Sequence, residues 1–238
     1  MKILAIETSG SAGSVSLSVG SEILERGLAT AREQTASILP TVRALLAEAA
    51  LSLDKLDAIA FGRGPGSFTG LRVAAAIAQG FGLVSGVPLV PVSSLAALAL
   101  QGERRFGLRD ALICVDARMD EIYWARYSMA GASDPIATAE ECLSAPADLA
   151  SAYAEWPVPT ASAPAMGCLG DGFRRYADDL IDITSCAGRT IADIEPVARD
   201  VGSLGAELYA AGKAVEPHQA LPVYLRDESA WRRQPASN

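Results

Sequence analysis

Apolar and polar positions alternate regularly along the first half of the chain. Residues 2–7, 13–19 and 22–28 are short apolar or alternating segments, which predicts three strands in a meander. Apolar positions then recur at helical spacing over about 32–50, which predicts an amphipathic helix. Pro40 lies inside it and should kink the helix or limit its first turns.

A second strand and helix follow directly. Residues 57–61 predict a strand, and the segment 69–85 predicts a helix that is apolar nearly all round, so we expect protein to cover both of its sides. A buried strand over 87–92 and a helix ending near residues 101–102 come next, with Ser93 or Ser94 as the helix cap.

The pattern then restarts. The later elements expected are strands over 111–115, 121–127 and 165–169, a turn over 116–120, a loop over 156–164, and helices over 146–154, 173–180 and 194–211. Two lobes that each begin with strands and then alternate strand and helix predict an α/β fold built from a duplicated unit. We expect lobes at 1–107 and 108–238, with the end of the second packing back on the first.

Composition narrows the function. A net charge of −8 and a pI near 4.8 oppose unaided binding to a phosphate backbone, which requires clustered Lys and Arg. The four cysteines form no Cys-x-x-Cys pair and no secretory signal is recognisable, which favours reduced thiols and a cytoplasmic location. The uncharged run 73–92 approaches membrane-spanning length, but its glycines and prolines favour a buried helix, a turn and a strand.

A glycine-rich loop connects the strand at 57–61 to the following helix. It lacks the Gly-x-x-x-x-Gly-Lys-Ser/Thr motif of a phosphate-binding loop and also the Gly-x-Gly-x-x-Gly spacing. Two interpretations remain open, a structural turn before a buried helix and a binding or interface role. The residues concerned are Gly62, Arg63, Gly64, Pro65, Gly66 and Ser67, with Ser67 or Thr69 as the cap.

Candidate catalytic groups are few. His218 is the single histidine, which rules out a two-histidine metal site and makes a Ser-His-Asp triad improbable. Glu7, Asp116 and Asp120 could gather between the lobes for magnesium or base chemistry, or the aspartates could simply make turn hydrogen bonds, which we favour.

Four segments carry a family resemblance. They are residues 1–9 (MKILAIETS), 62–72 (GRGPGSFTGLR), 115–124 (VDARMDEIYW) and 222–226 (PVYLR) with Ala230 and Trp231. In this order they resemble the TsaB family, the non-catalytic partner subunit in bacterial synthesis of threonylcarbamoyladenosine beside the tRNA anticodon. The resemblance implies the actin-like ATPase fold, with two duplicated lobes of mixed sheet flanked by helices.

The resemblance also gives meaning to two absences. The catalytic homologue TsaD carries a His-x-x-x-His metal pair on its first long helix, whereas the matching residues 32–38 here contain no histidine. Active members carry Asp-x-Gly in the second lobe, whereas Arg118 here places a side chain where a phosphate would approach. Glu7, Asp116 and Gly170 are therefore expected to mark a vestigial nucleotide cleft, without a metal or a cofactor.

By family similarity the first-lobe helices form a dimer, either with a second copy of this chain or with TsaD. The ATPase TsaE joins the complex. The resemblance implies that tRNA binds to the whole complex and not to this chain alone. No membrane contact is implied. An active kinase or carbamoyltransferase of the same fold remains the alternative, and an endopeptidase a more remote one. The interface candidates are Gln34, Ile38, Thr41, Leu71, Arg72 and Ala75, and we expect the first three on the exposed side of their helix.

Overall fold

The computed structural model describes residues 1–28, 34–129, 136–138, 140–156 and 166–226. Some of the predicted elements and motif residues lie outside these ranges. They are the helix start at 32–33, most of the loop at 156–164, the beginning of the strand at 165 and the motif residues Ala230 and Trp231, and for Gln34 only the helical backbone is described.

The first sheet has the strand order β3-β2-β1-β4-β5. The first three strands form the predicted antiparallel meander, and β4 and β5 add parallel to β1. The strands are β1 (Lys2–Glu7), β2 (Ser14–Val19), β3 (Glu22–Gly27), β4 (Ala58–Gly64) and β5 (Leu89–Ser93).

The second sheet repeats this topology. From β8 inward its order is β8-β7-β6-β10-β11, with β9 also paired to β7. The β6–β7 and β7–β8 pairs are antiparallel, whereas β10 and β11 run parallel to β6, as in the first sheet. The duplicated α/β unit is thereby confirmed. The strands are β6 (Asp110–Arg118), β7 (Glu121–Ser128), β8 (Ile136–Ala137), β9 (Cys142–Ser144), β10 (Gly167–Leu169) and β11 (Arg189–Ile191).

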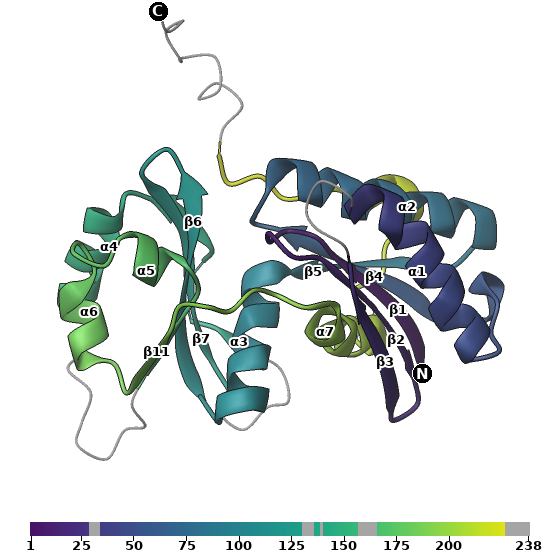
Figure 1. Cartoon of the computed structure of the whole chain (residues 1–238), viewed down its shortest axis with the longest axis horizontal. Coiled ribbons are helices and arrows are strands. Elements are labelled where there is room, and N and C mark those ends of the chain that lie inside the picture. Colours follow the sequence, from purple (N-terminus) through teal and green to yellow (C-terminus); the bar gives the residue numbers. More distant parts are fainter. Residues whose placement is uncertain (29–33, 130–135, 139, 157–165, 227–238) are drawn as a thin grey trace, which may run out of the picture.

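Helices of the same lobe cover one face of each sheet. Helices α1 (Gln34–Glu48) and α2 (Phe68–Ser85) bury one face of the first sheet, while α4 (Pro146–Ala154), α5 (Gly172–Arg175) and α6 (Ile181–Cys186) cover the outer face of the second (Figure 1). α2 is long and apolar enough to span a membrane, but its inner side packs on the first sheet as a core helix does.

The remaining faces are covered by an exchange between the lobes. Helix α7 (Ala198–Ala210), which ends the second half, packs on β1, β2 and β4 of the first sheet. Helix α3 (Ser94–Phe106), which ends the first half, packs on β6, β7 and β10 of the second. The two helices touch, and Arg104 of α3 binds both carboxylate oxygens of the buried Asp200 of α7 at 2.8 Å.

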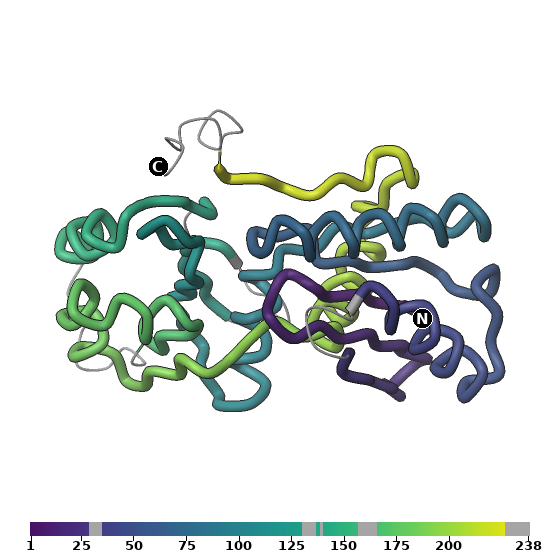
Figure 2. Tube along the Cα trace, turned by 45° about the horizontal axis from the view of Figure 1, so that its top comes forward, coloured from purple at the N-terminus to yellow at the C-terminus, as the bar shows by residue number. Residues whose placement is uncertain are grey.

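After α7 the chain returns along the first lobe (Figure 2). Val215 pairs with Leu89 of β5, a short 3₁₀ helix (Pro217–Gln219) lies against α2, and the Val223 amide donates to the Arg63 carbonyl at 2.8 Å. The chain then crosses to the second lobe at Arg226. We call residues 220–226 the strap.

Several predicted boundaries were wrong. Helix α1 contains Pro40 in its second turn and ends at Glu48, two residues before the predicted end near residue 50. The helix expected over 173–180 ends at Arg175 in the short helix α5, residues 176–180 form turns, and neither the separate helix α6 nor the edge strand β11 was predicted. The last helix begins at Ala198 instead of 194, because the segment before it, with Pro196, is extended and crosses between the lobes. Both predicted serine caps are present, since Ser67 accepts from the Gly70 amide and Ser93 from the Ala96 amide.

Candidate functional site in the cleft between the lobes

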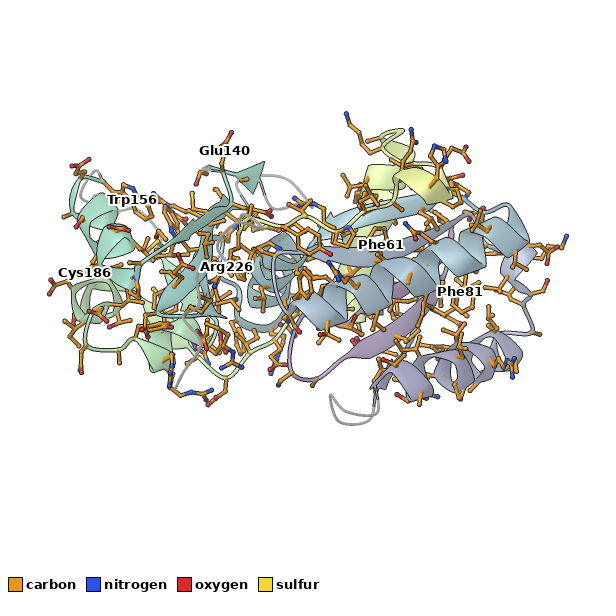
Figure 3. The ribbon with its side chains drawn as sticks, turned by 90° about the horizontal axis from the view of Figure 1, so that it is seen from above. Phe61, Phe81, Glu140, Trp156, Cys186 and Arg226 are labelled. Atoms are coloured by element: carbon orange, nitrogen blue, oxygen red, sulfur yellow. The ribbon has the colours of Figure 1, made fainter. Side chains whose placement is uncertain are left out.

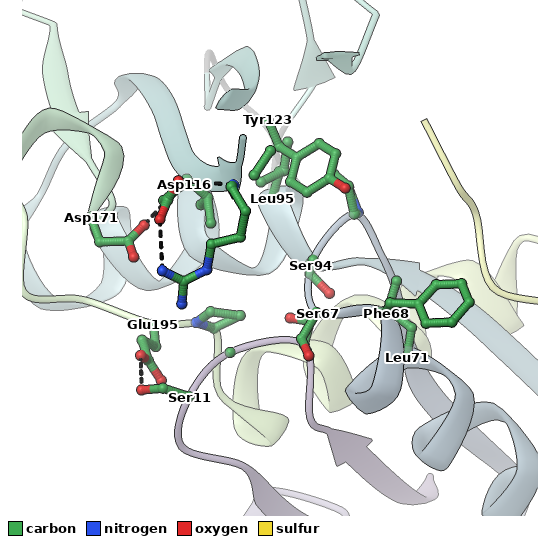
Figure 4. A pocket seen from close by; sticks show the side chains of 18 of the residues that line it. Ser11, Ser67, Phe68, Leu71, Ser94, Leu95, Asp116, Tyr123, Asp171 and Glu195 are labelled. Carbon is green, nitrogen blue, oxygen red and sulfur yellow. Dashed lines mark hydrogen bonds and ion pairs between the residues drawn. The ribbon is translucent and has the colours of Figure 1, made fainter. Parts of the chain in front are cut away.

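A cavity of about 590 Å³ lies between the two sheets. One wall comes from the β1–β2 turn, the loop before α2 and the start of α3, and the other from the β6–β7 hairpin and the extended segment before α7 (Figure 4). The residues whose polar side chains line it include Ser11, Ser67, Asp116, Asp171 and Glu195.

Glu7 lies beneath the first-lobe wall, fully buried at the end of β1. Its carboxylate accepts from the Ser9 amide at 2.5 Å and from the Ser94 hydroxyl at 2.9 Å. Gly62 passes so close that a Cβ there would lie 2.1 Å from the carboxylate oxygen. Burial raises the pKa of Glu7 above its usual value, although the bonds from Ser9 and Ser94 act against this. Glu7 therefore joins β1, β4 and α3 instead of facing the cavity.

Replacing Glu7 with glutamine is expected to stabilise the protein increasingly as pH rises. Because the folded-state pKa is raised above 4.5, Glu7 favours folding at low pH, and this contribution is lost as pH rises through the raised pKa. Glutamine keeps the acceptor for the Ser9 amide and can donate to Ser94. Urea unfolding of both proteins from pH 4.5 to 8 measures this difference in the free energy of unfolding. A difference that does not change with pH would contradict it.

The β1–β2 turn is bound by a carboxylate of this chain. Glu195, in the segment before α7, accepts from the Ala12 amide at 2.8 Å and from the Ser11 hydroxyl. The two carboxylate oxygens therefore occupy one amide and one hydroxyl donor of this turn. A Cβ on Gly10 would lie 2.8 Å from the same carboxylate, so a larger residue there would displace the Glu195 side chain.

Backbone amides of the β6–β7 hairpin also donate to carboxylates of this chain. The Asp116 amide donates to the Asp171 carboxylate and the Arg118 amide donates to the Asp116 carboxylate, both at 2.9 Å. Arg118, Met119 and Asp120 all have positive φ, between 57° and 63°, a conformation that costs energy for residues other than glycine. The favoured interpretation of Asp116 as a turn residue fits these bonds. Gly170, with φ of 112°, packs against the Cys114 carbonyl, where a Cβ would lie 2.3 Å away, so its role is in packing.

The strap holds this hairpin from the first lobe. Arg226 is buried between the lobes and donates to the carbonyls of Ala117 and Arg118 at 3.0 and 3.1 Å, and it pairs with Glu121 (Figure 3). A second contact between the lobes is the ion pair of Arg63 in β4 with Glu141. The Glu141 carboxylate also accepts hydrogen bonds from the Ser93 and Tyr127 hydroxyls. Bonds of this chain thus connect the lobes at two places.

The glycine loop is tightly packed. A Cβ on Gly64 would lie 2.7 Å from the Leu71 side chain, and one on Gly66 would lie 2.6 Å from Ser9. Of the two interpretations of this loop, its glycines support the structural turn, while Ser67 and Pro65 also line the cavity.

The expected positions of the interface candidates need correction. Ile38 was expected on the exposed side of its helix, but it is 0% exposed and packs in the first core. Leu71 and Ala75 are also buried, because they face the sheet, while Arg72 is exposed and Thr41 half-buried. Within the described part of this chain only one side of α2 is covered. Its outer side exposes Leu83 (73%) and Val84 (86%), together with Ala76 and Gly80.

Sequence reasoning missed Glu195, Asp171 and Arg226 as cleft residues. Each reaches its partner from a segment 55 or more positions away in the chain. The available signals were weak: the Glu195-Pro196 pair before a helix and the arginine closing the family motif at 222–226.

Two lobes with the same strand order, closed by exchanged helices around a cleft, define the actin-like ATPase fold. The family model described as tRNA N6-adenosine threonylcarbamoyltransferase, TsaD, matches residues 28–166. The protein from Escherichia coli K12 named tRNA threonylcarbamoyladenosine biosynthesis protein TsaB is 33% identical over 99% of both chains. The TsaB protein of Haemophilus influenzae is 40% identical over 53% of each chain. This chain belongs to the TsaB family.

Solved structures agree with this placement. The structure titled YeaZ from Pseudomonas aeruginosa has a TM-score of 0.83 and 35% identity, and the match covers 94% of this chain and 99% of that one. Another structure, with a TM-score of 0.82 and 35% identity, is titled as an uncharacterised protein with similarity to peptidase YEAZ from Pseudomonas aeruginosa.

Proposed function

We propose that this chain is a non-catalytic subunit in the biosynthesis of threonylcarbamoyladenosine in tRNA. The observation that carries the proposal is the occupied cleft. Glu195 binds the Ala12 amide and the Ser11 hydroxyl of one hairpin, and Asp171 and Asp116 bind two amides of the other, so a phosphate at these donors would have to displace carboxylates of the protein itself. Among the described residues no three metal-binding side chains cluster to assist it.

The proposed partner is TsaD, and the proposed contact is the outer side of α2 with the adjoining side of α1. This side exposes Leu83, Val84 and, on α1, Leu39, beside the small residues Ala76 and Gly80. Large exposed apolar side chains beside small residues fit a helix-to-helix interface. A second copy of the chain uses the same side when TsaD is absent, and TsaE joins the larger complex, in the cytoplasm.

Light scattering tests the proposal, with ATP hydrolysis followed in the same samples. The chain alone is expected to be a homodimer that hydrolyses no ATP above the protein-free blank. Adding TsaD from the same organism should give a one-to-one heterodimer. If the chain ignores TsaD and turns over ATP, the proposal fails and an active kinase or carbamoyltransferase replaces it.

The endopeptidase alternative has little structural support, although one similar structure carries that word in its title. His218 is exposed on the 3₁₀ helix beside α2 and does not line the cleft. No hydroxyl or thiol of the described residues is hydrogen-bonded to it. A pure preparation whose peptide cleavage disappears on His218→Ala would revive this alternative.

A further inference from the structure

The end of the second sheet that lies away from the cleft carries two arginines on one aromatic ring. The guanidinium carbon of Arg105 lies 4.9 Å from the centre of the Phe106 ring, and that of Arg189 lies 4.6 Å from it. The two positive groups are therefore less than about 10 Å apart. They come from the last turn of α3 and the first residue of β11, which are more than eighty positions apart in sequence.

The sheet explains why these segments meet. Gly167 of β10 pairs with Arg189 on one side and with Ala111 of β6 on the other, so the starts of three parallel strands lie side by side. Arg109 precedes β6 at the same end, and its guanidinium donates only to the Met129 carbonyl among the described residues.

The charges at this end are not balanced by the protein. In the part of the chain that the structure describes, Arg105, Arg109 and Arg189 are exposed and form no ion pair. Neighbouring arginines differ, because Arg104 is paired with Asp200 and Arg126 with Asp110. An acidic protein of net charge −8 thus keeps a local cluster of unpaired guanidinium groups.

We infer that this cluster, Arg105, Phe106, Arg109 and Arg189, contacts the phosphate backbone of tRNA bound to the complex. Phosphate contacts in nucleic-acid complexes are made chiefly by arginine and lysine, and guanidinium groups bind phosphate in two-point geometry. The Phe106 ring holds two of these groups in place, which lowers the ordering cost of the contact. The inference rests on the proposed function, since that function supplies the RNA.

A purely structural role explains the cluster less well. One arginine over the ring would already cover it, whereas a second positive group brings like charges together without a carboxylate between them. An anion that binds between them relieves this repulsion. The acidic remainder of the chain then explains why binding requires the complex, because the cluster alone is small against the overall charge.

The test is the salt dependence of tRNA binding. A fluorescein-labelled tRNA transcript that reads codons beginning with A is titrated with the chain alone and with the chain mixed with TsaD, between 50 and 300 mM KCl. Arg105→Glu/Arg189→Glu in the mixture is expected to bind about tenfold more weakly at 100 mM salt. Its slope of log affinity against log salt should be smaller by about one to two, because each arginine that no longer binds a phosphate lowers the slope by about one.

Two further variants separate the possible outcomes. Arg26→Glu/Lys213→Glu makes the same change of charge on the first lobe and should bind tRNA as the parent does, and Arg105→Lys/Arg189→Lys should keep most of the slope. Equal weakening by both glutamate pairs, or none by Arg105→Glu/Arg189→Glu, overturns the inference. Light scattering on each mixture separates the two proposals: absence of the heterodimer in the parent would defeat the proposed function, whereas an intact heterodimer whose tRNA binding is unchanged by Arg105→Glu/Arg189→Glu would overturn the inference alone.

Discussion

The variant Leu83→Glu/Val84→Glu is expected to weaken association with TsaD by at least about 100-fold. Both side chains lie on the outer side of α2, 73% and 86% exposed, where they contact little of their own chain. The substitutions should therefore leave the fold intact. In the proposed interface, however, they would place two carboxylates in an apolar contact without partners, which costs several kcal/mol. A decrease of about 2.7 kcal/mol in binding free energy already corresponds to a hundredfold in affinity.

A matched control is available on the second lobe. Ile181, at the start of α6, is 57% exposed and lies away from the first-lobe helices, so Ile181→Glu makes the same change on an unrelated surface. Titration calorimetry with TsaD should find this control equal to the parent, and light scattering should find Leu83→Glu/Val84→Glu monomeric. If that variant binds TsaD as tightly as the control does, the outer side of α2 is not the contact.

Replacing Gly70 with alanine is expected to destabilise the protein by about 3 kcal/mol or more, or to prevent folding. A Cβ at this position would lie 1.8 Å from the backbone carbonyl oxygen of Thr8. The contact is fixed from both sides, because the Thr8 hydroxyl donates to the Gly70 carbonyl at 2.7 Å. Neither backbone can move without separating the start of α2 from the end of β1.

The same substitution ten residues later in α2 should act in the opposite direction. Nothing lies within 4 Å of a Cβ on Gly80, so Gly80→Ala replaces a poor helix former by the best one. It is expected to stabilise the fold by up to about 1 kcal/mol. Urea unfolding followed by circular dichroism, at several protein concentrations, measures both variants. Similar stabilities for the two alanine variants would contradict the packing described at Gly70.

Local patterns in the sequence predicted much of the fold. Alternation of apolar residues located the meander, and the serines before α2 and α3 located their caps, because these features depend on residues a few positions apart. The outer side of α2 was not predictable in this way. A helix that is apolar all round has no periodicity from which to tell its covered side from its exposed one.

The cleft was predictable only in part. Asp116 lines the cavity, whereas Glu7 lies beneath its wall, and the groups that complete the cleft come from distant segments. Glu195 binds a turn 183 positions before it. The arginine cluster was missed for the same reason, since clustering of Arg105 with Arg189 depends on the pairing of β10 with β11. Counting charges along the chain had indicated only an acidic protein.

The exchange of α3 and α7 has a consequence for synthesis on the ribosome. The face of the first sheet that includes Ile3 and Ala60 is covered by α7, whose last residue is Ala210. At about 5 to 20 residues per second, roughly 10 to 40 s pass between synthesis of β1 and synthesis of α7. During that interval the nascent first lobe exposes an apolar surface that nothing yet translated can cover. Its folding therefore finishes only after α7 has been synthesised, and the two lobes become stable together.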